Sequence, residues 1–287
     1  MASAITVLLD GVAAGMLLFV LSVGLSVTLG LMNVVNLAHG AFGMLGGYVC
    51  VVLLNRLGVP FPLALLAAAA AAAAMGFVLE RLLYVHIYGR DHLTQVLFSI
   101  GLVFIMGAVA DWLMGARTQL IQLPSWLSGR MEFAGIGLGR YRLFLIILCG
   151  IVALALHFGL VRTRFGARLR AAVDDGVVAR GMGLPVGRIF SITFALGSGL
   201  AGLGGALGVE ILGLDPNFPL KYMVYFLVVV AVGGANSVAG PFLAALLLGV
   251  VDVAGKYWIP EVGAFIIYTA MVVLLLARPQ GLLARAK

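Results

Sequence analysis

Charged residues are scarce in this sequence of 287 residues. Asp, Glu, Lys and Arg together make up 10% of it, against about 25% in an ordinary soluble domain. Hydrophobic residues make up 63%, and the mean hydropathy is +1.17. A soluble fold of this size needs far more charge on its surface, so the composition excludes that class and predicts a polytopic membrane protein.

Patterns for catalysis, metals and cofactors are missing as well. The four histidines show no metal-ligand spacing, and no Ser/His/Asp or Cys/His arrangement is evident. GSGLAG (197–202) has the GxGxxG spacing, but it lies inside an apolar run with no preceding strand. GVVDVAGKY, around Lys256, lacks both the spacing and the Ser or Thr of a P-loop. We therefore expect no enzyme activity, no cofactor and no metal.

Cysteine is also rare, and the N-terminal residues do not have the pattern of a cleavable signal peptide. Cys50 and Cys149 both fall in apolar runs, so we expect buried free thiols. The N-terminal MASAITVLLDGVAAG has no basic segment and carries Asp10, and we expect a retained first helix. The net charge of +7 is better explained by basic loops held in the cytoplasm than by nucleic-acid binding.

Long apolar runs define the fold class. Six of them can each cross about 30 Å of hydrocarbon as a helix. They cover approximately residues 11–31, 60–83, 94–114, 141–161, 189–212 and 263–276. Strand-like alternation is absent. We predict an all-α, polytopic membrane helical bundle of eight to nine helices, some interrupted, forming a single domain over residues 1–287 with a cytoplasmic helix within 162–188.

Basic residues predict which loops face the cytoplasm. Loops 81–92, 162–188 and 278–287 carry 11 of the 18 Lys and Arg residues, and loops 55–60, 116–142, 213–221 and 256–262 carry the other 7. Because basic loops are retained inside, we place the first set in the cytoplasm.

Two apolar segments are too short for comfortable spans and lie beside Gly- and Asn-rich interruptions. They cover about 40–54 and 221–232, and the second ends in GGANSVAGP (233–241). Each follows a long helix, and the predicted topology runs those two helices in opposite directions. Paired interrupted segments are typical of a transport path between inverted repeats, so we predict such a repeat around the 141–161 helix.

Small residues at helical spacing predict close helix packing. GxxxG pairs occur at Gly11/Gly15, Gly43/Gly47 and Gly204/Gly208. Glycine lets two helix backbones approach each other. Structural packing is therefore the first explanation for these residues.

The longest polar stretch, 161–188, contains a short amphipathic helix. Leu169, Ala172, Val173, Gly176 and Val177 fall on one face at helical spacing, and Gly181, Gly183 and Pro185 then end it. Such a helix either lies among lipid headgroups or docks in a groove of a cytoplasmic partner. The adjacent acids favour a protein groove. The predicted docking residues are Arg168, Leu169, Ala172, Val173, Asp174, Asp175, Gly176, Val177 and Gly183.

RAAVDDGVVARGMGLP (170–185) resembles the coupling loop of ABC importer permeases, with Arg170 in place of the usual glutamate. The chain more specifically resembles the branched-chain amino acid permease family. This resemblance is carried by GLMNVVNLAHGAFGMLGGYV (30–49), the 166–207 segment, VVVAVGGANSVAGPFLAALLLGVVD (228–252) and RPQGLL (278–283).

The resemblance implies a permease subunit in a bacterial inner membrane, working by alternating access. It implies four kinds of partner: two ATP-binding cassette ATPase subunits, a second permease of the family, a periplasmic binding protein and a small solute. The substrate would be branched-chain or related amino acids, although similar permeases are assigned to urea and short amides. Two further alternatives are an ion-coupled secondary transporter and a purely structural membrane subunit.

The two interruptions are the predicted substrate path. Broken backbone at membrane depth exposes N–H and C=O groups to a solute only where it lines a cavity. The predicted path residues are Asn33, Asn36, His39, Gly40, Gly43, Gly46, Gly47, Gly233, Gly234, Asn236, Ser237 and Gly240. His39 has two candidate roles: it hydrogen-bonds across the path, or it is a structural histidine that holds the break in place. Asp111, Glu210 and Asp252 are costly in spans, so we expect them to pair or to face the path.

Overall fold

The computed structural model describes residues 2–32, 34–133, 136–234, 238–278 and 281–283. Six of its helices are long and apolar enough to cross a membrane: α1 (Ala2–Met32), α3 (Phe61–Leu82), α4 (His92–Met114), α5 (Arg140–Arg162), α8 (Val186–Leu212) and α10 (Ala239–Trp258). Three shorter apolar helices are α2 (His39–Asn55), α9 (Phe218–Gly233) and α11 (Gly263–Ala277). These nine helices of the described chain confirm the predicted all-α membrane bundle.

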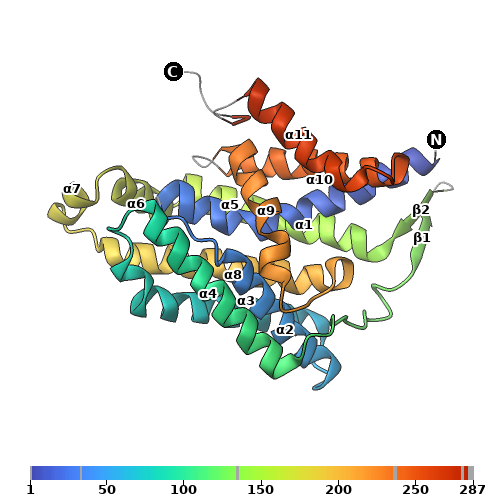
Figure 1. The fold of residues 1–287 in the computed structure, drawn as a ribbon, viewed down its shortest axis with the longest axis horizontal. Coiled ribbons are helices and arrows are strands. Elements are labelled where there is room, and N and C mark those ends of the chain that lie inside the picture. The colour runs from blue at the N-terminus through green and yellow to red at the C-terminus, as the bar shows by residue number, and fades with distance from the viewer. Residues whose placement is uncertain (1, 33, 134–135, 235–237, 279–280, 284–287) are drawn as a thin grey trace.

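Short elements mark the two ends of the bundle (Figure 1). At one end lie α6 (Arg164–Asp174) and α7 (Gly176–Gly181). At the other end β1 (Arg130–Phe133) and β2 (Ile136–Gly139) form an antiparallel hairpin in which Arg130 faces Gly139. We call these the α7 end and the hairpin end. A 3₁₀ turn, η1 (Tyr84–His86), follows α3.

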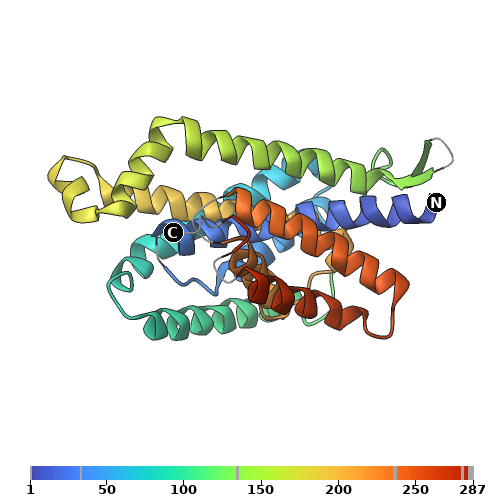
Figure 2. The same cartoon turned by 90° about the horizontal axis from the view of Figure 1, so that it is seen from above.

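The two predicted sets of loops lie at opposite ends of the molecule. Figure 2 shows loops 81–92 and 162–188 at the α7 end, and loops 116–142 and 256–262 at the hairpin end. The same separation is visible in Figure 1. The chain therefore crosses the bundle in the order that the sequence predicted.

Helix ends follow local capping chemistry. Asp91 caps α4 by accepting a hydrogen bond from the Thr94 amide at 3.1 Å. Hydrogen bonds from the Thr94 side chain and amide hold the pKa of Asp91 below its usual value. Proline stands in the first turns of α3 and α9, where no amide donor is needed.

The long helices α1 and α8 contact each other through glycine residues. α1 packs along α10, α8 packs along α3, and α1 and α8 cross each other. A Cβ on Gly197 of α8 would lie 3.2 Å from the Gly24 carbonyl oxygen of α1. A Cβ on Gly15 of α1 would lie 2.7 Å from the Ala245 oxygen of α10. The GxxxG pair at Gly11/Gly15 thus packs helix on helix, as predicted.

This packing fits the hypothesis of an inverted repeat. α1 and α8 run in opposite directions, and each is followed by a short helix and then by two more apolar helices (Figure 1). The α1–α10 contact corresponds to the α8–α3 contact in such a repeat, and the α2–α3 contact corresponds to α9–α10. α5, α6 and α7 then connect the two halves. Equivalent helices in the two halves therefore make equivalent contacts.

Candidate functional site

The first interruption, between α1 and α2, is held by buried side chains. Asn36 is 1% exposed, and its Oδ1 accepts a hydrogen bond from the Tyr84 hydroxyl at 2.7 Å. The backbone amide of Val35 donates to Gln95 Oε1 at 2.9 Å. The break is thus fixed by η1 and by the first turn of α4, which places it towards the α7 end.

His39, at the start of α2, is also buried and satisfied. Its Nε2 lies 2.8 Å from the carbonyl oxygen of Leu21 in α1, and its ring meets Phe226 of α9 edge-on at 6.3 Å. These contacts match the structural role that the sequence left open for this residue: His39 ties α2 to α1 and α9.

The path glycines of α2 sit against neighbouring backbone. A Cβ on Gly46 would overlap the backbone of Gly202 in α8, and one on Gly205 would overlap that of Gly43. A Cβ on Gly40 would lie 3.0 Å from Pro219, and one on Gly47 would lie 2.9 Å from the Leu214 side chain. The glycines permit close packing of α2 on α8 and α9. Their role in a substrate path stays a prediction.

The second interruption follows α9. Gly234 ends that helix at φ = +81°, a backbone conformation that favours glycine. Gly233 has no room for a Cβ because Gly240 and Pro241 lie against it. The amide of Leu282 donates to the Val232 oxygen at 2.8 Å, so the C-terminal segment closes over this break. Of the predicted path residues, Asn33, Asn236 and Ser237 lie outside the described residues.

The predicted single amphipathic helix at the α7 end is wrong. α6 ends at Asp174, and Asp175 then takes an extended conformation. The Asp175 Oδ1 accepts hydrogen bonds from the amides of Val177 and Val178, both at 2.9 Å. The physical reason is N-capping. An aspartate whose carboxylate accepts hydrogen bonds from two following amides starts a new helix instead of continuing the previous one. Gly183, at φ = +81°, lies beyond the end of α7, where a glycine stop was predicted.

The break between α6 and α7 divides the predicted apolar face into a buried part on α6 and an exposed part on α7. Leu169 and Ala172 of α6 are buried with Val186 and Ile189 of α8, so they anchor the segment to this chain's own body. By contrast, the α7 side chain of Val177 is 72% exposed. Val178 and Met182 are exposed beside it, and Arg168, Asp174 and Asp175 are exposed polar neighbours. A partner at this end would therefore meet α7 rather than the Leu169 face.

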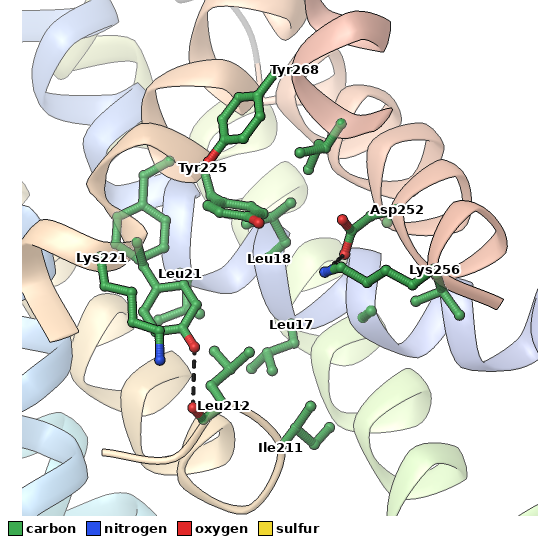
Figure 3. Close-up of a pocket in the computed structure, with 16 residues that line it drawn as sticks. Leu17, Leu18, Leu21, Ile211, Leu212, Lys221, Tyr225, Asp252, Lys256 and Tyr268 are labelled. Carbon is green, nitrogen blue, oxygen red and sulfur yellow. Dashed lines mark hydrogen bonds and ion pairs between the residues drawn. The ribbon is translucent and has the colours of Figure 1, made fainter. Parts of the chain in front are cut away.

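A cavity with charged side chains in its lining lies elsewhere, in the half of the bundle nearer the hairpin end. It has a volume of ≈ 540 Å³ and lies between α1, α9, α10 and α11, beside the end of α8 (Figure 3). One wall is aliphatic, and it consists of Leu17, Leu18, Leu21, Ile211 and Leu212. The other wall carries the polar side chains of Lys221, Tyr222, Tyr225, Asp252, Lys256 and Tyr268.

An ion pair stands in the polar wall. Lys256 Nζ lies 2.6 Å from Asp252 Oδ2, one helical turn away on α10. Asp252 Oδ1 is buried and makes no hydrogen bond to any described residue. Figure 3 shows the carboxylate and the ammonium side by side, on the side of the cavity that faces Leu18 and Tyr225. The cavity is therefore lined by both an ion pair and aliphatic side chains.

Of the three acids expected to pair or to face a path, Asp252 pairs with Lys256 and lines this cavity. Asp111 lies exposed on α4, and Glu210 lies exposed near the end of α8. Two other acids matter that sequence reasoning missed. Asp10 forms an ion pair with Arg142 at the start of α5. Glu80 is 2% exposed, and Tyr88 donates to its Oε1 at 2.9 Å. Burial, reinforced by that carboxylate, raises the pKa of the Tyr88 hydroxyl, which therefore stays protonated as a donor.

Part of the polar wall has a recognisable sequence pattern, which the predictions above did not include. Asp252 and Lys256 have the i, i+4 spacing of a helical ion pair, and Lys221, Tyr222 and Tyr225 occupy one helix face. Their contact with α1 could not be found from local spacing, because about 185 residues or more separate α1 from α9 and α10.

Comparison with known proteins assigns the family. A family described as "Branched-chain amino acid transport system / permease component" matches residues 7–276. The chain belongs to this family. Membership in a transport-permease family confirms the resemblance seen in the sequence, and it makes this chain an integral membrane transport component rather than an enzyme.

Individual relatives of the permease match over nearly the whole chain. It is 26% identical to the high-affinity branched-chain amino acid transport system permease protein BraD of Pseudomonas aeruginosa, over 97% of this chain and 95% of the relative. It is 24% identical to LivH of Escherichia coli K12, over 96% and 94%. LivM of the same organism is 27% identical over 93% of this chain and 68% of the relative. No solved structure matches this permease.

Proposed function

We propose that this chain is the permease subunit of an ABC importer that moves branched-chain or related small amino acids across a bacterial inner membrane. The observation that carries the proposal is the cavity, in which an aliphatic wall faces an ion pair inside an otherwise apolar bundle. Its volume of ≈ 540 Å³ lies within the usual range for small-molecule sites, about 300–1,000 Å³. The relatives named above are called branched-chain amino acid permeases, which supports this substrate class.

Energy comes from partners in this proposal. The ATPase subunits bind at the α7 end, where Val177, Val178 and Met182 are exposed on a short capped helix. LivH and LivM, both relatives of this chain, are named from one organism, which supports a paired permease. A periplasmic binding protein would deliver the solute at the hairpin end, the end nearer the cavity.

Alternating access follows from this arrangement. The cavity lies towards the hairpin end, and both interruptions lie towards the α7 end, where packed glycines and His39 close the path. Nucleotide-driven motion of α7 reaches α8 through the buried contacts of Leu169 and Ala172 with Val186 and Ile189. Rigid packing of this kind transmits a displacement instead of absorbing it.

Co-purification from the native membrane tests the proposal first. Mass spectrometry of the gently extracted chain should find two P-loop ATPases and a second permease. The reconstituted complex with its binding protein should then take up labelled leucine or valine when ATP is supplied. A chain that comes out alone and moves solute under an ion gradient would overturn the ABC assignment, and uptake of urea or amides without leucine would overturn the substrate class.

A further inference from the structure

The Asp252–Lys256 ion pair contributes little to stability as it stands. Its side chains are 15% and 50% exposed, and ion pairs at this spacing on a partly exposed helix stabilise a protein only weakly. Asp252 lies within the apolar helix α10, with Lys256 in its last turn, and an acidic side chain inside a spanning helix is costly and marks a functional site by default. The pair therefore needs an explanation other than holding α10 together.

The hydrogen-bonding capacity of the pair is only partly used. Asp252 Oδ2 accepts from Lys256, but Oδ1 is buried without a partner among the described residues. A lysine ammonium has three donors, and the only hydrogen bond that Lys256 makes to another described side chain is the one to Asp252. An acceptor for a cation and a donor for an anion thus stand side by side at one place in the cavity.

We propose that this pair recognises the head of a free α-amino acid as a zwitterion. The substrate ammonium binds the Asp252 carboxylate, and the substrate carboxylate binds Lys256 Nζ, since both residues line the cavity. In an α-amino acid both charged groups are attached to one carbon, so they meet two protein charges that are themselves only 2.6 Å apart. Binding leaves the ion pair intact and neutralises all four charges, so no isolated charge is buried.

The aliphatic wall then receives the substrate side chain. Leu17, Leu18 and Leu21 of α1 line the cavity together with the pair, and in Figure 3 the pair faces Leu18. A branched aliphatic side chain buried there is stabilised in proportion to the apolar surface that it removes from water. The chemical class assigned to this cavity is therefore an aliphatic, zwitterionic amino acid. This inference rests on the proposed function and adds the residues that recognise the substrate.

Thiol protection measures binding at the permease itself. A Val253→Cys variant places a thiol in the cavity wall, whereas the native Cys50 and Cys149 are buried. In the assembled transporter, L-leucine at millimolar concentration should slow modification of this thiol. Two analogues should fail at the same concentration: 4-methylpentanoate, which lacks the ammonium, and 3-methylbutylamine, which lacks the carboxylate. Equal protection by either analogue would overturn the proposal.

Charge removal provides the second test. Asp252→Asn and Lys256→Gln should each lower ATP-driven leucine uptake by about tenfold or more, the effect of losing one charge-assisted hydrogen bond. The double variant should be as inactive as the singles. A merely structural ion pair predicts the opposite, because removing both charges together restores neutrality. Glu261→Gln, an exposed carboxylate at the hairpin end, should retain uptake.

Failure of zwitterion recognition and failure of the proposed function give different uptake results. Wild-type uptake of leucine together with normal uptake by both charge variants would overturn zwitterion recognition and leave the importer standing. No uptake of any branched-chain amino acid by the wild-type complex would overturn the proposed substrate class, and with it this inference.

Discussion

Buried hydrogen bonds at the first interruption depend on single atoms. The Tyr84 ring packs between Phe98 and Phe194, with centroids 5.1 and 4.6 Å away, and its hydroxyl reaches Asn36. The ring and the hydroxyl can therefore be separated experimentally, because phenylalanine keeps the first and removes the second.

Tyr84→Phe should destabilise the folded chain. It leaves the buried Asn36 oxygen without its donor, which costs about 1–3 kcal/mol. Thermal unfolding of the purified protein in detergent measures this as a lower melting temperature. Tyr257→Phe is the matched control, because Tyr257 is exposed. Equal melting temperatures for the two variants would show that the Tyr84–Asn36 bond contributes nothing.

Glycine at the α2–α8 contact is the second prediction at this scale. A methyl group on Gly46 would overlap the backbone of Gly202, whereas one on Gly101 of α4 would meet nothing within 4 Å. Gly46→Ala should separate α2 from α8 and sharply reduce the yield of folded protein. Gly101→Ala should be neutral or stabilise its helix by up to about 1 kcal/mol. Size-exclusion profiles of both variants check this, and comparable monodisperse yields would contradict the packing.

At the residue scale the sequence located the unusual positions but not their contacts. It singled out Asn36, His39 and the glycines of α2 because polar and flexible residues are rare in such a chain. It could not assign Tyr84 to Asn36 or Leu21 to His39, because those partners come from other helices. Glu80 was overlooked because its environment depends on the fold of the loop that follows it.

The turn between α6 and α7 shows how one side chain ends one helix and begins the next. Asp175 holds the amides of Val177 and Val178 at the start of α7. α7 has only six residues, which is too few for a helix to persist in water without such support.

Asp175→Ala should therefore fray α7. Hydrogen exchange at the amides of Val177 and Val178 should accelerate, since both lose their acceptor. Asp175→Asn should preserve protection because asparagine caps as well as aspartate does. The pair of variants separates capping from charge. If Asp175→Asn exchanges as fast as Asp175→Ala, the carboxylate charge, rather than the cap, holds the helix.

Helical periodicity located α3, α4, α5, α8, α11 and the two short helices within a few residues of their observed bounds. It started the first helix at residue 11, whereas α1 begins at Ala2, and it did not identify α10 as a span. It joined α6 to α7 because residues 169–177 keep a helical spacing through Asp174 and Asp175. Periodicity is blind to side-chain bonds with the backbone, and one such bond redirected the exposed apolar surface to α7.

At the scale of the whole molecule, the α7 surface should decide assembly with the ATPases. Val177→Glu and Met182→Glu place charge on side chains that are 72% and 68% exposed, so the fold should tolerate them. If the ATPase buries these side chains, its co-purification should fall by about tenfold, the effect of losing one interface anchor worth over 1 kcal/mol. Val262→Glu, on an exposed side chain at the hairpin end, should leave it unchanged. Full recovery of ATPase with both α7 variants would locate the docking surface elsewhere.

Loop charges predicted which of the described loops lie together at one end of the molecule. The cavity was beyond reach, since its walls combine α1 with α9, α10 and α11. Contacts between helices so distant in sequence leave no local pattern, except for the small residues that allow the backbones to meet.

The contact of α1 with α10 also means that α1 must wait for its partner helix during synthesis. Gly11 lies against Val250, so α1 enters the bilayer about 240 residues before its partner exists. At roughly 5–20 residues per second, this interval lasts about 12–50 s. Throughout it, the glycine face of α1 lacks α10, and for about the first half of it Asp10 also lacks Arg142 of α5. A newly made α1 is thus an unsheltered helix, and membrane insertion factors that shield it should matter more for the yield of this protein than the stability of the finished bundle.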